Sequence, residues 1–391
     1  MLHVCITWQN RADKKPDLNQ LHFCMAEDSS DSILSALIIP KIPNNGFDAH
    51  IFYYDFIKDV ANFLLRNTRL HLPPKRTFTI LEIEFYLRDE VNDHCDPFSH
   101  GHEHQLTCGE WYFHHVGRFG YRGGSRKGID ITFGSKNRNI YGGILIRAIR
   151  DDETNQVIEG PSLVVDKILE LCGVDQQGGI RKLVEVKWKG QNGISKNMEN
   201  SNGLVYLEKI DDENTNNVDM SMIIEKKRRK NATVVTSPFF TQAFSKRIKK
   251  DFHEDSSMNR STSELVLYSS PRVGLTLFNT QPSPSCRLRY LLKPYRFFLF
   301  PHLLNKGKMQ IVIGLYERFK NIDKVSEASN ISRSVVERCI KEMTAGMNNG
   351  NINDFVGKKG RGANGNDYCR MVGVVRKWET ETYNKSEREH I

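Results

Sequence analysis

The chain has 391 residues, 39% of them hydrophobic and 26% charged, which is enough for one large domain with additions or for two domains. No stretch approaches the roughly 18 consecutive apolar residues that a membrane-spanning helix needs, and the beginning of the chain lacks the pattern of a secretory signal peptide. The eight cysteines include no Cys-x-x-Cys pair, which argues against a disulfide-stabilised secreted scaffold and against a zinc ribbon. We therefore expect a soluble intracellular protein.

The net charge of +9 is concentrated in one segment. Residues 221–250 contain nine Lys or Arg and one Glu, so the remaining 361 residues carry a net charge of about +1. A uniformly basic protein that coats DNA is therefore excluded, and affinity for nucleic acid must come from local patches. The basic run at 226–230 is typical of a nuclear-localisation signal or a nucleic-acid contact, but a solvated loop has the same composition. In a eukaryotic cell we expect the nucleus, and otherwise the cytoplasm.

The first part of the chain predicts a leader, a helix and a strand. Residues 1–45 mix polar residues with prolines and are expected to form a poorly ordered leader. Apolar residues three and four positions apart predict an amphipathic helix over 52–65. Alternation then predicts a strand over 77–87, with Leu81 and Ile83 on one face and Glu84 and Tyr86 on the other.

Two further strands and a helix follow. Alternating residues predict a strand over 128–134, and an apolar run predicts its partner over 142–149. If residues 134–143 form the connecting loop, the register of this hairpin places Asp130 opposite Arg147. Such a cross-strand pair of opposite charges contributes about 0.2–1 kcal/mol. Residues 160–173 have the apolar spacing of a helix, with Val164 and Ile168 on one side.

The second half of the chain contains a long polar segment and a helical tail. Residues 190–261 are rich in Asn, Ser, Asp and Lys, and most of them are expected to form a polar and basic insertion. Structure is predicted to resume at 263–278 and 290–300. From about residue 305 the pattern is helical, and residues 322–343 have helix-turn-helix spacing, with a turn at Asn330 and Ser332 as an N-cap. That spacing occurs in DNA-binding proteins and also in helical pairs that do not touch DNA.

Two clusters of polar residues are candidate sites on residue type alone. Glu84 and Tyr86 project from one face of the first strand, as a general base beside a flat substrate would, although a solvent-facing sheet has the same pattern. Residues 93–115 hold six of the thirteen histidines together with two cysteines, which are ligand types for zinc. No ligand pair there has the spacing of a small zinc module, and a polar loop is the alternative interpretation.

A metal-dependent nuclease is a third possibility. The segments KGID at 127–130 and VEVKW at 184–188 are similar to the Asp…Glu-x-Lys arrangement, in which two carboxylates hold magnesium and a lysine polarises a water. That arrangement would bring Asp130 together with Glu185, although 54 residues and a predicted strand–helix unit separate them. Two ordinary strands would contain the same short motifs.

Eight segments, taken in chain order, resemble the alkyladenine (3-methyladenine) DNA glycosylase family. They cover about residues 52–299 and are FYYDFIKDVANFLL, EIEFYL, GIDITFG, GGILIRAI, IEGPSLVVDKILEL, GLVYLEK, SPRVGL and KPYRFFL. The resemblance implies an α+β fold, in which one mixed domain at 46–304 contains a curved, mostly antiparallel sheet flanked by helices. Residues 305–391 would add a helical C-terminal extension with helix-turn-helix-like spacing, and the insertion would occupy 190–261.

The resemblance also implies an activity. Members of this family hydrolyse the N-glycosidic bond of a damaged purine, alkylated or deaminated, that has been extruded from double-stranded DNA, and they leave an abasic site. The resemblance implies no metal and no other cofactor. We therefore expect a monofunctional DNA repair hydrolase that binds duplex DNA carrying a damaged base. The alternatives are a non-catalytic DNA-binding protein on the same fold, which would use its tail helices, and the nuclease.

The family's site residues match this sequence unevenly. Glu84 falls at the position of the general base that activates a water, and Arg147 matches the strand arginine near the site. Tyr86 and His94 fall at the aromatic walls that stack on the extruded base. Asp130 stands where the family usually has an asparagine in the base pocket, so the resemblance implies an altered choice of base.

Two of the family's motifs are missing. The turn Thr-Pro-Arg-Asn after the histidine is replaced by DPFSHGHEH, so His100 is a second candidate for the stacking histidine. The tyrosine that wedges into the DNA is absent near residue 123, where Tyr121 or Arg122 would have to replace it. The residues expected to hold the phosphates are Arg122, Arg126 and Lys127, together with the basic insertion.

Overall fold

The computed structural model describes residues 32–42, 48–117, 120–175, 179–196, 202–210, 265–277, 284–356 and 364–389. The predicted fold class is confirmed, because the chain is an α+β protein with a curled antiparallel sheet, flanking helices and a helical C-terminal region. The basic run at 226–230 and most of the predicted leader and insertion lie outside the described residues. No helix within the described ranges is both long enough and apolar enough to cross a membrane.

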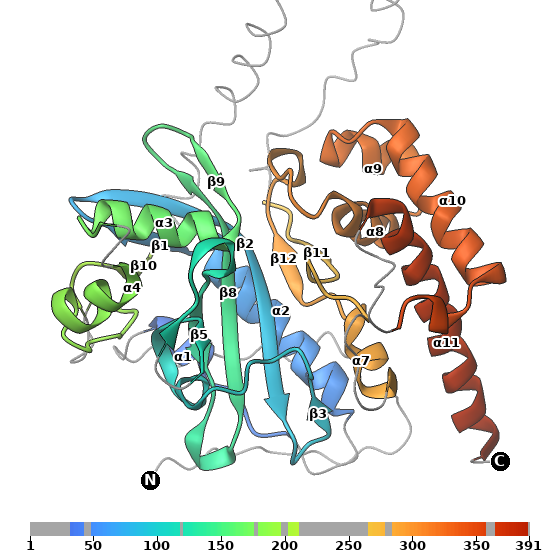
Figure 1. Cartoon of the computed structure of the whole chain (residues 1–391), viewed down its shortest axis with the longest axis horizontal. Helices are drawn as coiled ribbons and strands as arrows, with labels where there is room; N and C mark the ends of the chain where they lie inside the picture. The colour runs from blue at the N-terminus through green and yellow to red at the C-terminus, as the bar shows by residue number, and fades with distance from the viewer. Residues whose placement is uncertain are drawn as a thin grey trace, which may run out of the picture. The chain divides into compact units, whose positions relative to one another are not determined.

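One sheet organises the fold (Figure 1). Its main path runs β10-β1-β2-β8-β7-β4, while β3 and β12 pair with β2, β9 pairs with β8, and β11 pairs with β12. All of these pairings are antiparallel. The strands are β1 Thr68–Leu72, β2 Arg76–Asp89, β3 His94–Cys95, β4 Cys108–Phe113, β7 Ile129–Phe133, β8 Tyr141–Asp151, β9 Val157–Glu159, β10 Tyr206–Lys209, β11 Tyr268–Ser270 and β12 Arg296–Phe298. A separate ribbon consists of β5 His115–Val116 and β6 Gly120–Tyr121.

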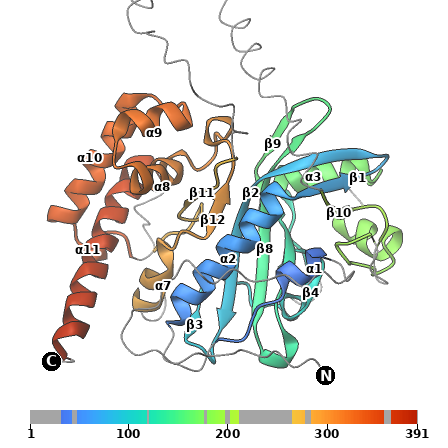
Figure 2. The same cartoon turned by 180° about the vertical axis from the view of Figure 1, so that it is seen from behind.

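Helices lie on the sheet and beside its β11–β12 edge. Figure 2 shows α2 crossing one face of the sheet next to β2 and β8, with the last four helices grouped beside β12. The helices are α1 Ser32–Leu37, α2 Ala49–Arg66, α3 Pro161–Leu171, α4 Gly179–Arg181, α7 Pro284–Leu291, α8 Lys308–Phe319, α9 Ile322–Ser329, α10 Arg333–Asn349 and α11 Gly365–Glu389. The helix α1 falls within the stretch that the sequence predicts to be a poorly ordered leader, and its Ile33 and Leu37 are buried.

The helix α2 forms because its apolar residues make one continuous stripe. Tyr53, Ile57, Val60 and Leu64 are spaced three or four positions apart and are buried. The helix begins after Asp48, whose carboxylate accepts a hydrogen bond from a backbone N–H of the first turn. The stripe packs in the same hydrophobic cluster as the apolar face of β2, so α2 covers that face.

The strand β2 departs from the predicted alternation at one point. Its pairing with β8 shifts register between Ile80 and Ile83, which is the mark of a β-bulge. As a result Leu81 packs in a second hydrophobic cluster, with the C-terminal helices, while Ile80 and Ile83 pack with α2. The prediction that Leu81 shares a face with Ile83 is therefore wrong, because one extra residue in the strand reverses the side to which it points.

The β7–β8 hairpin is tighter than the sequence suggests. Asp130 pairs with Leu145, and Ser135 forms a bridge with Ile140, so the connection is much shorter than the predicted loop of 134–143. Asn139 makes the tight turn possible by adopting the left-handed conformation, with φ of 53°. The prediction that Asp130 lies opposite Arg147 is therefore wrong by two residues of register.

The C-terminal region has its own hydrophobic core. The helices α8, α9, α10 and α11 bury one cluster of side chains against each other and against the β11–β12 edge. The predicted helix-turn-helix spacing describes α9 and α10 correctly. The first helix ends at Ser329, and its C-cap Asn330 has a left-handed φ of 56°. Ser332 is the N-cap of the second helix, and Val325, Ile331 and Val336 are buried.

Candidate functional site

Several of the predicted site residues share one face of the sheet. Glu84 of β2 pairs with Leu145 of β8, Leu145 pairs with Asp130 of β7, and Asp130 pairs with Tyr112 of β4. Directly opposite residues in antiparallel strands project to the same side, and so does Tyr86, two residues along β2 from Glu84. The register therefore places three predicted site residues on the face opposite α2. They are Glu84, the predicted general base, Tyr86, a predicted aromatic wall, and Asp130, the predicted pocket carboxylate.

Glu84 is completely buried and fully hydrogen-bonded. Its Oε1 accepts a hydrogen bond from the backbone N–H of Val273 at 2.7 Å. Its Oε2 accepts one from the Tyr86 hydroxyl at 2.9 Å and one from Arg147 Nη1 at 3.3 Å. Three donors from three separate parts of the chain thus hold this carboxylate in one orientation.

A network of arginines and carboxylates surrounds Glu84. Glu82 Oε1 accepts hydrogen bonds from Arg147 Nε and from Arg296 Nε, both at 2.7 Å. Burial alone would raise the pKa of Glu82, but Arg296 and Arg147 together hold it below its ordinary value. For Arg147 the directions are reversed: burial alone would lower its pKa, but the charges of Glu84 and Glu82 outweigh burial and raise it. Arg147 therefore stays charged and compensates both carboxylates.

Tyr86 is held as a neutral hydrogen-bond donor. Burial, and next the adjacent carboxylate of Glu84, raise the pKa of this phenol well above its ordinary value. The guanidinium of Arg272 lies over the ring, 4.7 Å from its centroid. Arg272 is itself completely buried and is fixed by Asp96, with Nη1–Oδ2 and Nη2–Oδ1 distances of 2.5 and 3.2 Å. The Tyr86 ring is therefore fixed by a second buried ion pair behind it.

Asp130 lies over Gly143, which is the β8 residue opposite Tyr86. A Cβ atom at Gly143 would come within 2.7 Å of Asp130 Oδ2 and of Gln105 Nε2, so a larger residue here would push these two side chains aside. Asp130 Oδ1 lies 2.8 Å from His114 Nε2, and Gln105 Nε2 donates to Oδ2 at 3.4 Å. The carboxylate is thus placed close to Tyr86 and is oriented by two side chains from the histidine-rich segment.

His100 lies beside His114 at the border of this face. Its ring lies edge-on to His114, with 4.4 Å between centroids, and the residue retains exposed surface. Desolvation by the surrounding chain, followed by the nearby His114, lowers the pKa of His100 to about 4. His100 is therefore a neutral, flat and partly accessible side chain next to the Asp130 corner.

His94 does not reach this face, which corrects its predicted role as an aromatic wall. It is completely buried on the α2 side, where its ring lies 4.8 Å from that of Tyr53. Nδ1 lies 3.1 Å from the carbonyl oxygen of Leu87, and Nε2 lies 2.8 Å from the Tyr295 hydroxyl. Burial, and next the neighbouring His50, lower the pKa of His94 to about 3. It is a neutral core residue that joins β3 to the end of β2.

The predicted DNA-contacting residues lie around the β5–β6 ribbon and differ in exposure. Tyr121 is half-buried against His115, with ring centroids 4.5 Å apart, and Arg122 Nε donates to the His115 carbonyl at 3.0 Å. Lys127 forms an ion pair with Asp166 of α3. Arg126 is exposed. The set predicted from sequence therefore contains one exposed cation, Arg126, and three side chains that pack against the protein.

The geometry supports neither the zinc site in the histidine-rich segment nor the metal-dependent nuclease. Within the described ranges, no group of three or more His, Cys, Asp or Glu side chains is placed to hold a metal ion. The predicted strand with the Glu-x-Lys motif is instead a short π-helix, Lys182–Lys187. Its Glu185 is exposed and pairs with Arg181 at 3.3 Å, whereas Asp130 is buried on the sheet. The possible Asp…Glu-x-Lys arrangement is therefore not formed, and residues 184–188 are not the ordinary strand that was the alternative interpretation.

Sequence reasoning missed half of the network around Glu84. It gave no role to Glu82, Arg272, Val273 or Arg296, although the last three lie in the SPRVGL and KPYRFFL segments. Arg272, Val273 and Arg296 lie more than 180 residues from Glu84 along the chain, and the β11–β12 segment that pairs with β2 brings them to it. An Arg inside an otherwise apolar strand, as in KPYRFFL, was the available signal, because a buried arginine requires a buried acid.

Comparison with known proteins leaves the family open. No protein-family model matches the chain. The chain is similar to an uncharacterized protein of Acanthamoeba polyphaga mimivirus, at 35% identity over 127 residues, which is 30% of this chain. The chain spans 57% of the length of that relative, and the relative's name states no activity.

Proposed function

We propose that this protein is a DNA repair glycosylase that hydrolyses the N-glycosidic bond of an extruded, damaged purine and leaves an abasic site. The observation that supports it most is the placement of Glu84, Tyr86 and Asp130 on one sheet face, with Arg147 beside Glu84. These are residues whose positions match those of the alkyladenine DNA glycosylase family in the sequence. The proposal does not extend to His94, which is a core residue.

The proposed reaction begins with extrusion of the damaged nucleotide. Swinging a base out of a duplex costs a few kcal/mol, and less where damage has weakened its pairing. The flat base would stack between Tyr86 and His100, and stacking on an aromatic ring contributes about 1–3 kcal/mol per base. Asp130 would accept a hydrogen bond from the edge of the base. These contacts together offset the cost of extrusion and favour damaged bases.

The chemical step would be performed by Glu84. Its carboxylate would take a proton from a water whose oxygen forms a bond to C1′ of the sugar. The bond between C1′ and the base nitrogen breaks, and its electron pair leaves with the base. The negative charge of Glu84 would also stabilise the positive charge that develops on the sugar, while Arg147 orients the carboxylate. The phosphates of the duplex would be held by Arg126 and by other basic groups.

The proposal requires a local movement, because Glu84 has no exposed surface. Tyr86 is the half-buried neighbour whose hydroxyl covers Oε2 of Glu84. To bring a water and C1′ to the carboxylate, the extruded nucleotide would have to break the hydrogen bond of Tyr86 to Glu84 and shift a ring that Arg272 holds from behind. Val273, which covers Oε1, is also half-buried and belongs to a turn rather than to a strand.

The test compares wild type with Glu84→Gln on duplex oligonucleotides that contain 1,N6-ethenoadenine, hypoxanthine or 3-methyladenine. We expect wild type to release base from at least one of them and Glu84→Gln to lose release by at least about a hundredfold, because general acid–base catalysis contributes roughly 10²–10⁴-fold. Binding to the same duplex should persist, since glutamine keeps the shape of the side chain. Glu185→Gln is the matched control, because that carboxylate is exposed and distant in sequence. Equal release by Glu84→Gln and wild type would contradict the proposal.

A second candidate is a non-catalytic DNA-binding protein on the same fold. The observation that favours it is the burial of Glu84, with both carboxylate oxygens already engaged by protein donors. This candidate predicts that wild type binds duplex DNA but releases no base from the whole panel.

A further inference from the structure

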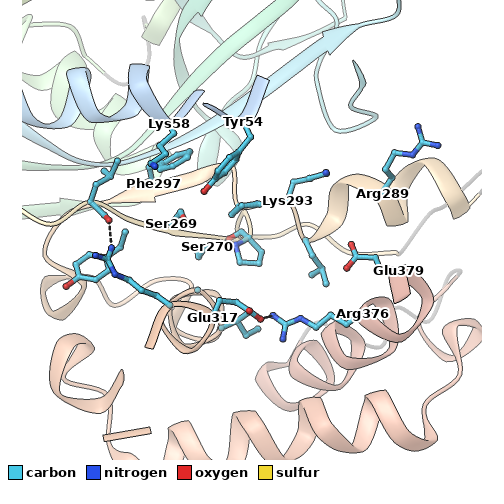
Figure 3. A pocket seen from close by; sticks show the side chains of 18 of the residues that line it. Tyr54, Lys58, Ser269, Ser270, Arg289, Lys293, Phe297, Glu317, Arg376 and Glu379 are labelled. Atoms are coloured by element: carbon cyan, nitrogen blue, oxygen red, sulfur yellow. Dashed lines mark hydrogen bonds and ion pairs between the residues drawn. The ribbon is translucent and has the colours of Figure 1, made fainter. Parts of the chain in front are cut away.

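A cleft of about 970 Å³ lies between the α2 side of the sheet and the C-terminal helices (Figure 3). Tyr54 and Lys58 of α2 form one wall, and Glu317 of α8 and Arg376 of α11 form the other. The segment around β11 closes one side. Glu84 does not line this cleft, so its ligand would be separate from the substrate of the proposed reaction.

The wall made by α2, α7 and the loop after α7 carries an excess of positive charge. Lys58, Arg289 and Lys293 line it, and Arg289 is partly compensated by Asp93 at 3.1 Å. On the opposite wall Arg376 is paired with Glu317. The lining as a whole holds five cations and two carboxylates, Glu317 and Glu379, and this excess of positive charge favours an anionic ligand.

Lys293 and Glu379 lie in the cleft without a direct partner. Both are half-buried, and within the described residues no hydrogen bond or ion pair joins either charged group to the protein. Burial lowers the pKa of Lys293 and raises that of Glu379, and the opposite charge of each residue only partly offsets the shift of the other. Figure 3 shows both at the same end of the cleft as Arg289. Half-buried charges of this kind are satisfied when a ligand supplies the missing contacts.

Aromatic side chains and one hydroxyl complete the lining. Tyr54 points into the cleft in Figure 3, and Trp378 of α11 and Phe297 of β12 also line it. Ser269 presents a side-chain hydroxyl from β11 in the same view. Aromatic faces bind flat rings by stacking, while ammonium and hydroxyl groups are donors for phosphate oxygens. The volume lies within the range of ordinary small-molecule sites, which is about 300–1,000 Å³.

We propose that this cleft binds a small organic phosphate that carries an aromatic ring, of the mononucleotide class. Lys293 and Arg289, which lie at the same end of the cleft in Figure 3, hold the phosphate. Tyr54 and Trp378 contact the ring, and Glu379 accepts hydrogen bonds from the amino groups or hydroxyls of the ligand. The site lies on the other side of the sheet from Glu84, because Phe297 faces the cleft while its neighbour Arg296 faces Glu82. Binding there is independent of base release by the Glu84 face.

The test is isothermal titration calorimetry of the full chain with AMP, adenosine and inorganic phosphate as probes. We expect saturable binding of AMP to one site, with weaker binding of phosphate and of adenosine, because each of these supplies only part of the contacts. Lys293→Met should raise the Kd for AMP at least about tenfold, since it removes a charge-assisted contact without adding bulk. Trp378→Leu should also weaken AMP binding and leave phosphate binding unchanged.

Lys324→Met is the matched control, because Lys324 is an exposed lysine of α9 that does not line the cleft. It should bind AMP as wild type does, and the melting temperatures of all variants without ligand should agree. Absence of saturable AMP binding would overturn the proposal. So would an unchanged Kd in a folded Lys293→Met variant, or phosphate binding as tight as that of AMP.

Discussion

Hydrogen-bond partners distinguish the residues of the candidate site from those of the hydrophobic core. Glu84 and His94 are both completely buried, but Glu84 is held by Tyr86, Arg147 and Val273 on the face of the sheet that also carries Asp130. His94 is instead engaged on both ring nitrogens by groups of the hydrophobic core. The same histidine-rich segment thus supplies a core residue and, six positions later, a side chain at the candidate site.

The Asp130 carboxylate should determine which base is accepted. A carboxylate offers only acceptors, whereas the amide of asparagine also offers an N–H donor. If Asp130 contacts the edge of the base, Asp130→Asn should increase release of hypoxanthine, which presents a carbonyl oxygen, relative to 3-methyladenine, which presents an amino group. We expect the ratio of the two release rates to rise about tenfold, equivalent to about 1.4 kcal/mol. An unchanged ratio would place Asp130 outside the base pocket.

Sequence patterns predict which individual residues lie at the candidate site better than they predict the contacts that those residues make. The alternation of β2 was enough to place Glu84 and Tyr86 on the same face, and the structure adds a hydrogen bond between them. It could not distinguish His94 from His100 as the residue near the site, because that depends on a turn whose family motif is missing here. The N–H donor of Val273 and the guanidinium of Arg272 over the Tyr86 ring depend on contacts between distant segments, which local patterns do not report.

At the level of secondary-structure elements, one arginine connects the two carboxylates of β2. Arg147 comes from β8 and contacts both Glu82 and Glu84, while Arg296 from β12 supports Glu82 from the other side. Three adjacent strands are therefore joined by side-chain ion pairs in addition to their backbone ladders. Buried ion pairs add little stability over an apolar pair, but removing one partner leaves a charge without compensation.

Arg147→Met should therefore destabilise the protein strongly. It removes one of the two cations on Glu82 and the only side-chain cation on Glu84 within the described residues. We expect the free energy of unfolding to fall by about 3–5 kcal/mol. Urea denaturation followed by circular dichroism measures this change. Arg126→Met, an exposed arginine, is the control and should stay within about 0.5 kcal/mol of wild type; a similarly small effect for Arg147→Met would show that the network is not needed for stability.

Element types were easier to predict than their register. The long amphipathic helix α2, the strand β2 and the helix pair α9–α10 all follow from apolar spacing and turn residues. The bulge that redirects Leu81 and the tight β7–β8 turn at Asn139 each change the register by one or two residues. Neither leaves a clear mark in the alternation, since β2 and β8 are buried on both faces along most of their length.

At the level of the whole described molecule, the sheet separates two environments. The α2 side is a hydrophobic core that contains neutral buried histidine, and the opposite side carries the charged network around Glu84. The C-terminal helices pack beside β11 and β12 and complete the cleft that Lys293 and Glu379 line. Substitutions in one environment are therefore expected to leave the other unchanged.

The buried histidine predicts a loss of stability in mild acid. The pKa of His94 is about 3 in the folded protein and 6.5 when unperturbed, so the unfolded chain binds the proton first. Its contribution to stability is complete above pH 6.5 and is lost as the pH falls toward 3. Between pH 7.5 and pH 5 this residue alone should lower the free energy of unfolding by about 2 kcal/mol.

Urea denaturation of wild type and of His94→Gln at several pH values isolates this effect. The variant should be less stable at pH 7.5, because it loses part of the core contacts, but its stability should depend less on pH between 7.5 and 5. The carboxylate of Glu82 has a lowered pKa in the folded protein, so it adds a separate loss of stability only when the pH falls below about 4.5, the ordinary pKa of this group. Parallel pH profiles for the two proteins would contradict the assignment of His94 as a neutral core residue.

The most direct test of the central claim is the identity of the product. Wild type and Glu84→Gln are incubated in EDTA with duplexes that contain each damaged purine, and the reaction is analysed by mass spectrometry. The account predicts that wild type yields the free base and an intact strand with an abasic site, and that Glu84→Gln yields neither. If wild type releases no base from any of the duplexes, or if Glu84→Gln releases it at the same rate, the proposed glycosylase activity is contradicted.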